Sequence, residues 1–289
     1  MLYEKFYNLR ELPFTLTPDP AFLYLSRQHR FALTLLRYGI ASHASFCLLS
    51  GEVGSGKTLL VRQLLSSLEQ EVRVGLIANT SRKFERMLPW VCLAFGLNHE
   101  GKDDAALFRL FTDFVLREHQ AGRRVVLIVD EAQNLTVELL EELRVLSNMN
   151  TSKQVLLQTF LVGQPELRDM LRLPELRQFA QRISSDFHLD PLSLDDARAY
   201  VRHRLTVAGG DFNLISAEAV ELAHASSGGV PRLINQLCDT ALVYGFAEQR
   251  PSIDAELMAQ VIADRAAGGI LPAQAAPAAA YLRAPANVV

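Results

Sequence analysis

The sequence is short of several features that would assign a chain to a class at once. Its only cysteines, Cys47, Cys92 and Cys238, are far apart and have no second cysteine or histidine at the spacing of a metal site. We therefore expect buried, reduced thiols. No run of about 18 apolar residues is free of charge, proline and glycine, and the N-terminus carries charges where a signal peptide is apolar. These absences predict a cytoplasmic protein without a membrane span.

The sequence also lacks an excess of charge of one sign. Lysine and arginine total 29 against 32 acidic residues, which gives a net charge of −3. Such a chain has no global field for holding a polyanion, so a histone-like binder of nucleic acid is excluded and only a local basic patch is allowed. Apolar residues make up 49% of the 289 residues, which is enough for a buried core and about two domains.

Residues 45–190 alternate short β-rich runs with longer amphipathic helical stretches. This alternation is typical of a parallel sheet that is covered by helices on both faces. It predicts an α/β fold with three layers, αβα, around a five-stranded parallel sheet. The expected strands are residues 45–50, 72–79, 124–130, 154–163 and 186–190.

The flanking regions differ from this core. Residues 191–267 carry no strand signal and predict a helical lid, whose helices start at Ser193 or Asp195, Ser216, Pro231 and Asp254. Residues 1–44 hold aromatics and prolines before a helix and are expected to pack on the α/β core. Residues 268–289 are rich in alanine and proline and predict a disordered tail.

The strongest local signal is GEVGSGKT at residues 51–58, which directly follows an expected strand and directly precedes an expected helix. Glycines in such a loop let backbone N–H groups and the helix N-terminus wrap around phosphates. Lys57 would reach the β- and γ-phosphate oxygens, and the Thr58 hydroxyl would bind Mg²⁺. The expected nucleotide-binding residues are Gly51, Glu52, Val53, Gly54, Ser55, Gly56, Lys57 and Thr58.

A second signal is RVVLIVDEAQ, a buried strand that ends in two adjacent carboxylates. Asp130 would hold Mg²⁺, as the acidic residue of a Walker B motif does. Glu131 would then orient and polarise the attacking water as a general base. Because no guanine-recognition motif of the NKxD type is present, the expected nucleotide is ATP.

The order of these motifs resembles that of AAA+ proteins, because an extra strand separates the P-loop from the acidic strand and a glutamate directly follows the aspartate. The resemblance implies three further roles. An arginine on a helix just before the last strand, Arg182 or alternatively Arg177, would be the arginine finger that enters a neighbouring subunit of a homo-oligomer. Arg232, in the sequence GGVPR, would contact the γ-phosphate from the lid. Gln164, after the fourth strand, would hold the water or the γ-phosphate.

The N-terminal sequence narrows the resemblance further. Residues 3–40 contain PFTLTPDPAFLY followed by a basic and aromatic helix, which resembles the opening of the ExeA/GspA group of secretion ATPases. Within that group the chain looks most like the ATPases associated with XrtA/PEP-CTERM systems and exopolysaccharide loci. The resemblance implies an ATP-hydrolysing protein that assembles or regulates an envelope export machine and reaches the inner membrane through a protein partner.

Two other functions compete with this interpretation. A DNA-dependent AAA+ ATPase of the transposition target-selection type has the same core, but it requires a basic face that the net charge of −3 does not favour. A nucleotide-gated scaffold without turnover would not require both Asp130 and Glu131. The sequence therefore favours ATP hydrolysis coupled to a protein partner.

Overall fold

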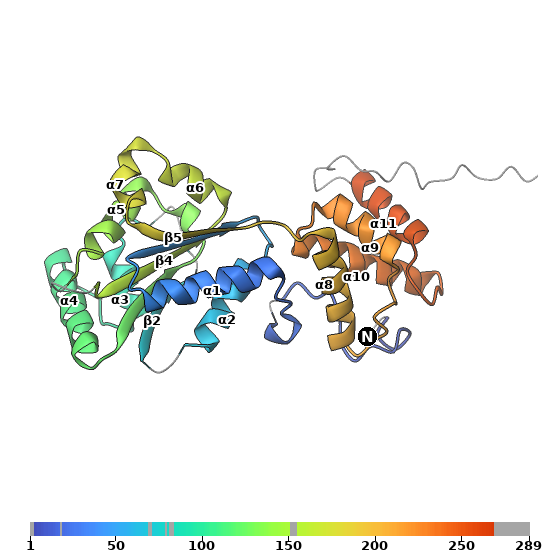
Figure 1. The fold of residues 1–289 in the computed structure, drawn as a ribbon, viewed down its shortest axis with the longest axis horizontal. Coiled ribbons are helices and arrows are strands. Elements are labelled where there is room, and N and C mark those ends of the chain that lie inside the picture. The colour runs from blue at the N-terminus through green and yellow to red at the C-terminus, as the bar shows by residue number, and fades with distance from the viewer. Residues whose placement is uncertain are drawn as a thin grey trace, which may run out of the picture. The chain divides into compact units, whose positions relative to one another are not determined.

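The computed structural model describes two compact units, which Figure 1 shows with their elements labelled. The sheet unit comprises residues 27–52 and 60–189, and the helical unit comprises residues 3–26, 53–59 and 190–268. The predicted disordered tail lies outside the described residues, except for its first residue. The described residues are 3–17, 19–68, 71–78, 80, 84–150 and 155–268.

The sheet unit is built on five parallel strands in the order β2-β3-β4-β1-β5. Every position of β1 and β4 is buried, which explains their mostly apolar sequences. The predicted fold class, an α/β fold with a five-stranded parallel sheet, is confirmed. The strands are β1 (Phe46–Gly51), β2 (Val72–Ile77), β3 (Arg124–Val129), β4 (Leu157–Gly163) and β5 (Ile183–Leu189).

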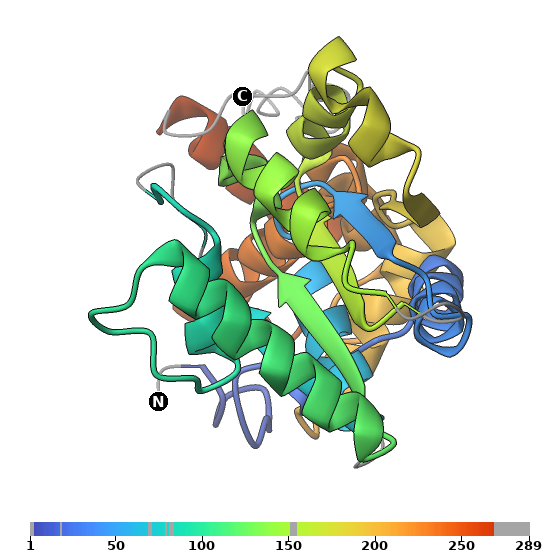
Figure 2. The ribbon, with the colours of Figure 1, turned by 90° about the vertical axis from the view of Figure 1, so that its left-hand side faces the viewer.

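Helices cover both faces of this sheet. Because successive side chains of a strand point to opposite faces, Val126 and Ile128 of β3 lie in one core and Leu127 lies in the other. The first face is covered by α1 (Arg27–Ala41) and α2 (Lys57–Ser66). Figure 2 views the molecule from the side of α4. The second face is covered by α3 (Leu88–Ala94), α4 (Asp104–Gln120), α5 (Val137–Leu146), α6 (Pro165–Leu171) and α7 (Arg177–Ala180).

The last strand differs from its prediction. It begins at Ile183 and not at residue 186, since it pairs with β1 from the register Phe46↔Ile183 onward. This edge strand alternates half-buried with exposed residues and opens Ile-Ser-Ser, so its apolar signal is weak at the start. Arg182, expected on a helix, therefore lies between the end of α7 and the first residue of β5.

The helical unit contains four helices after residue 190, and their starts follow the predicted signals. The side chains of Ser193, Ser216 and Asp254 each accept a backbone N–H three residues further on, and Pro231 is the first residue of its helix. The helices are α8 (Leu194–Val207), α9 (Ala217–Ser227), α10 (Pro231–Ala247) and α11 (Ala255–Ala267).

The expectation that residues 1–44 form one segment on the α/β core is wrong. Residues 3–26, which include the short 3-10 helix η1 (Pro20–Phe22), belong to the helical unit, whereas α1 belongs to the sheet unit. The reason is the burial of Tyr3, Tyr7, Phe14 and Phe22 in the core formed by α8 to α11. The sequence shows these aromatics but not which apolar surface they cover.

The three cysteines are buried and free, as predicted. Burial raises the pKa of Cys92 to about 11 and that of Cys47 to about 12, so both stay protonated thiols at neutral pH.

Arg204 on α8 fixes the N-terminal segment to the helical unit. Its buried guanidinium donates hydrogen bonds to the carbonyls of Pro13 and Thr15 and to the hydroxyl of Tyr200, and it lies 4.7 Å from the ring centroid of Phe22. Burial raises the pKa of Tyr200, so its hydroxyl keeps its proton and donates it to the side-chain oxygen of Asn235. One cation therefore satisfies three acceptors, of which the Pro13 carbonyl and the Tyr200 hydroxyl are buried.

We predict that Arg204→Met lowers the free energy of unfolding by about 2 to 4 kcal/mol, because these acceptors lose their donors inside a packed core. Arg204→Lys should recover only part of this loss, since one ammonium cannot replace the guanidinium fork. Urea denaturation followed by circular dichroism measures both. The matched control is Arg202→Met, which alters an exposed arginine of the same helix. Equal stability of the Arg204→Met and Arg202→Met proteins would contradict the prediction.

Candidate functional site

The glycine-rich loop connects β1 to α2. Gly51 is the last residue of β1, and Lys57 is the first residue of α2. Gly54 and Gly56 have positive φ angles of 82° and 102°, a backbone conformation that residues with a Cβ rarely adopt. A loop of this shape at a helix N-terminus turns backbone N–H groups toward one point, as an anion-binding loop requires.

The other residues of the loop divide by exposure. Ser55 and Lys57 are buried, and the exposed fraction of Lys57 is only 6%. Glu52, Val53 and Thr58 are exposed. Thr58 is the second residue of α2, so its hydroxyl stands on the first turn of the helix that follows the loop.

Arg232 lies next to this loop within the helical unit, which includes residues 53–59. The N–H of Arg232 donates to the carbonyl of Gly54 at 3.3 Å. A Cβ added to Gly54 would meet the Cβ of Arg232 at 2.4 Å, so only glycine fits there. The Arg232 side chain is exposed and leaves the first turn of α10, directly after Pro231.

Asp130 and Glu131 follow β3 at the carboxyl edge of the sheet. Asp130 is 5% exposed, and one of its carboxylate oxygens accepts the backbone N–H of Glu131 at 2.9 Å. The hydroxyl of Thr80, beyond the end of β2, donates to the carbonyl of Asp130 at 3.2 Å. Glu131 has a left-handed backbone, with φ 54° and ψ 36°. A glutamate in this conformation is strained, and such strain is common at functional sites.

Two glutamines hold the Glu131 carboxylate in place. Its Oε2 accepts hydrogen bonds from Nε2 of Gln133 at 2.6 Å and from Nε2 of Gln164 at 3.1 Å. The Oε1 of Gln133 also accepts the backbone N–H of Gln164 at 3.0 Å. The structure thus brings Gln164, which follows β4, to Glu131, which follows β3. Sequence reasoning missed Gln133, although it stands only two residues after Glu131 in the 3-10 helix η2 (Ala132–Asn134).

The predicted arginine fingers lie apart from this cluster. Nη1 of Arg182 donates to the hydroxyl of Ser147 at 2.9 Å and to the carbonyl of Arg144 at 3.4 Å, both at the C-terminal end of α5. Arg177 is the exposed first residue of α7. These two contacts hold Arg182 within its own subunit, at the end of the helix that follows Glu131.

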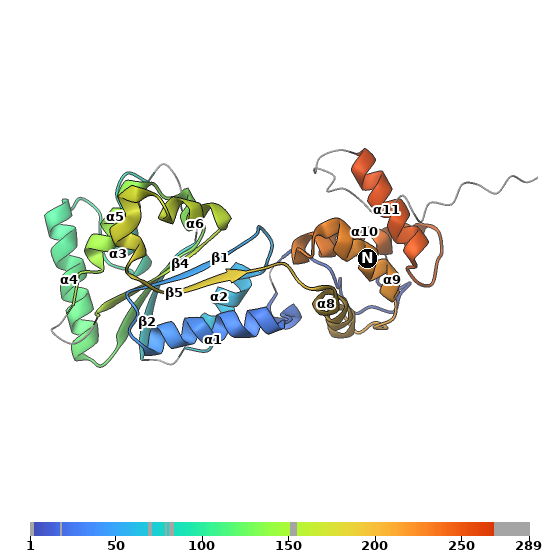
Figure 3. The same cartoon turned by 45° about the horizontal axis from the view of Figure 1, so that its top comes forward.

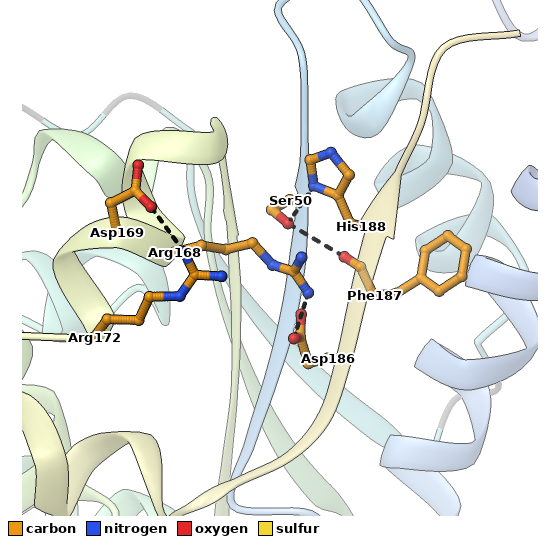
Figure 4. Close-up of polar contacts among 7 residues, drawn as sticks. All are labelled: Ser50, Arg168, Asp169, Arg172, Asp186, Phe187 and His188. Atoms are coloured by element: carbon orange, nitrogen blue, oxygen red, sulfur yellow. Dashed lines mark hydrogen bonds and ion pairs between the residues drawn. The ribbon is translucent and has the colours of Figure 1, made fainter.

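A polar cluster joins β1, β5 and α6 just before the P-loop (Figure 4). The hydroxyl of Ser50 lies 3.0 Å from Nδ1 of His188, and Arg168 of α6 forms an ion pair with Asp186 of β5. Ser50 is the residue before Gly51, so these contacts fix the strand end from which the P-loop leaves. No sequence motif pointed to His188.

A comparison with protein families gives a match that spans most of the sheet unit. Residues 40–171 match the family described as AAA domain. Two solved structures share its fold: the ORC2 protein of Aeropyrum pernix in ADPNP–ADP complexes and the walker-type ATPase PABY2304 of Pyrococcus abyssi. The first has a TM-score of 0.64 and 16% identity, and the match covers 90% of this chain and 72% of that chain. The second has a TM-score of 0.59 and 17% identity, covering 89% and 76%.

A curated relative is much more similar in sequence. General secretion pathway protein A of Aeromonas hydrophila is 46% identical over 248 residues, which are 85% of this chain and 45% of that protein. This similarity supports the resemblance to the ExeA/GspA group of secretion ATPases. The chain spans less than half the length of that relative.

The AAA fold implies a nucleotide with Mg²⁺, and the residues present fit both. The described residues bring together no group of three or more His, Cys, Asp or Glu side chains that could cage a metal ion. Mg²⁺ does not need one, because it binds through one or two protein oxygens, water and phosphate. The Thr58 hydroxyl and the buried Asp130 carboxylate are hard oxygen donors of this kind. None of the described helices has the length and apolar character to cross a bilayer.

Proposed function

We propose that this protein binds ATP with Mg²⁺ and hydrolyses it to ADP and phosphate. The observation that supports the proposal best is the carboxylate of Glu131, which two amide groups hold at the sheet edge where β3 and β4 end. A carboxylate fixed in this way can orient a water molecule, whereas a solvated surface glutamate cannot.

The P-loop residues 51–58 would bind the triphosphate, with backbone N–H groups and Lys57 on its oxygens. Thr58 and Asp130 would hold Mg²⁺, which neutralises charge on the β- and γ-phosphates when it is bound. Arg232 would add a cation from α10. Its backbone contact with Gly54 supports this role, because it fixes the start of α10 next to the loop.

Glu131 would act on the attacking water. Water oxygen forms a bond to the γ-phosphorus, the bond from that phosphorus to the bridging oxygen breaks, and ADP leaves with the bonding electrons. Glu131 accepts a proton from the water. Because Oε2 already accepts two amide hydrogen bonds, Oε1 is the oxygen that would receive the water. Gln133 and Gln164 are therefore positioning residues for the general base.

Arg182 would complete the active site of a neighbouring subunit in a homo-oligomer, with Arg177 as the alternative. A planar cation near the γ-phosphate stabilises the charge that develops during transfer. To do so, Arg182 must leave the hydroxyl of Ser147, a hydrogen bond whose loss costs little at a half-exposed site. Subunit contact and turnover would then be coupled.

We also propose that turnover drives or regulates the assembly of an envelope export machine, within a PEP-CTERM/exosortase and exopolysaccharide system. Two observations support this proposal. The chain is similar to general secretion pathway protein A, and its N-terminal segment resembles the opening of the ExeA/GspA group of secretion ATPases. The protein would work in the cytoplasm at the inner membrane and act on a protein partner.

The first prediction for this function concerns Glu131, the proposed general base. We expect Glu131→Gln to lower kcat for ATP by about a hundredfold or more and to leave the Kd for ATP within about twofold, because only water activation is lost. A phosphate-release assay and equilibrium binding of a fluorescent ATP analogue measure the two quantities. Glu138→Gln, at an exposed glutamate of α5, is the matched control.

Two results would contradict this assignment. Unchanged turnover in the Glu131→Gln protein would remove Glu131 as the base. Turnover that rises steeply with double-stranded DNA, with a strong salt dependence, would favour the DNA-dependent alternative over the export machine.

The second prediction concerns Gln133. Gln133→Leu removes one donor to Glu131 and the acceptor for the N–H of Gln164, so kcat should fall roughly tenfold at an unchanged Kd for ATP. Gln164→Leu should have a similar effect, and the double variant should lose less than the product of the two effects, because both residues act on one carboxylate. Independent effects, or a change in Kd alone, would show that the glutamines do not act through Glu131.

The third prediction tests the finger by complementation. Arg182→Ala should retain ATP binding and lose the rise of specific activity with protein concentration. Mixed with Glu131→Gln, it should regain activity, because the Glu131→Gln subunit offers its Arg182 to an intact Glu131 in the neighbour. Ser147→Ala, which removes only the partner of Arg182 within the subunit, should stay active. A failure to regain activity, with Arg177→Ala succeeding in the same assay, would assign the finger to Arg177.

A further inference from the structure

Helix α1 has two chemically different sides. One side packs against the sheet through buried residues at helical spacing: His29, Ala32, Leu33, Leu36 and Ile40. The opposite side is exposed, and its residues also recur every three or four positions. We call this exposed row the α1 stripe; it comprises Arg27, Arg30, Phe31, Arg37 and Tyr38.

The stripe exposes more aromatic surface than any other site among the described residues. Tyr38 is 65% exposed and Phe31 is 58% exposed, and these are the two largest values for the described large hydrophobic side chains. They stand seven residues apart, which is two helical turns or about 10 Å on the same side. Phe31 makes one ring contact, with Phe187 of β5 at 5.7 Å.

The same stripe is strongly basic. Arg27, Arg30 and Arg37 are exposed, and the sequence of α1 contains no acidic residue. A hollow of about 240 Å³ beside the end of α1 is lined by Arg37, Arg124 and Glu71, which adds one more cation and one acid. This local excess contrasts with the net charge of −3 for the whole chain.

The position of α1 makes the stripe accessible to a large surface. In Figure 3, α1 runs along the lower side of the sheet unit. The stripe runs from Arg27 to Tyr38 of this helix, so it extends over about 17 Å. An exposed row of this length on one helix can lie along an extended surface.

The combination of arginines with exposed rings decides which surface fits. Duplex DNA offers phosphates to the arginines, but its bases are stacked inside, so two solvated aromatic rings would gain nothing. The surface of an anionic bilayer offers lipid phosphates and, a few ångströms deeper, the boundary of the acyl chains, where aromatic rings settle. Unlike duplex DNA, the bilayer satisfies both kinds of side chain.

We propose that α1 docks this protein directly on an anionic membrane surface, with Phe31 and Tyr38 in the interfacial layer and the arginines on lipid phosphates. The proposal does not depend on ATP hydrolysis. In this proposal the chain binds the membrane itself, whereas the sequence resemblance implies attachment through a protein partner. Since three arginines and two rings bind weakly, several copies of the stripe in one oligomer would bind much more tightly.

The test is sedimentation of the full chain with vesicles made of equal parts of phosphatidylglycerol and phosphatidylcholine. We expect binding that weakens with salt and is lost on vesicles of phosphatidylcholine alone. Arg37→Glu should weaken binding more than fivefold, because it removes one cation, worth roughly fivefold, and adds a repelled charge. Tyr38→Ser should also weaken it, and this side chain makes no ring contact within the described residues.

The matched control makes the same changes on another exposed helix. Phe108 and Arg109 of α4 are exposed, and Phe108→Ser together with Arg109→Glu alters ring and charge without touching α1. This control should bind vesicles as the unaltered chain does, and melting curves show that all variants are folded. Equal loss in control and stripe variants, no binding to anionic vesicles, or tighter stripe-dependent binding to single- or double-stranded DNA would each overturn the proposal.

Discussion

The arrangement of the whole site depends on the parallel register of three neighbouring strands. Ser50 of β1 pairs with Gly163 of β4, and Val129 of β3 pairs with Leu161 of the same strand. Because the strands are parallel, the P-loop, Asp130 and Gln164 leave the sheet at the same edge. A slip of one residue would turn every side chain of β3 to the opposite core, so the packing of its buried residues in both cores protects the register and, through it, the site.

This register explains why the region around Glu131 tolerates strain. The left-handed backbone of Glu131 is unfavourable for a residue with a side chain, and it persists because the surrounding contacts fix it. Gln133 and Gln164 bind the carboxylate, and Asp130 accepts the N–H of Glu131. The same hydrogen bonds that stabilise the turn also orient the proposed base. Folding free energy is thus used to preorganise a reacting group before substrate arrives.

The sequence predicted those parts of the molecule that are local in chain and chemistry. The P-loop needs glycines at Gly54 and Gly56 because of their φ angles, and Ser216 and Asp254 cap helices within three residues. What it could not predict depends on distant partners. Gln133 shows no role in the sequence, because only the fold brings Gln164, at the end of β4, beside it. Arg182 was expected on a helix because the sequence does not show that β5 begins at Ile183, where it pairs with Phe46 of β1. The sequence also indicated that the N-terminal aromatics are buried, but it did not indicate which apolar surface they cover.

The exposed stripe of α1 is also a feature that the sequence alone did not predict, and the fold itself does not require it. The buried side of the helix supplies most of the packing against the sheet. Serine or glutamine at position 38 would leave that packing intact, and at position 31 it would remove only the ring contact with Phe187. Two large rings, flanked by three arginines on a helix without acids, bring no comparable gain in stability. These side chains would instead gain free energy by binding a surface outside the chain that accepts both cations and rings, and an anionic bilayer is such a surface.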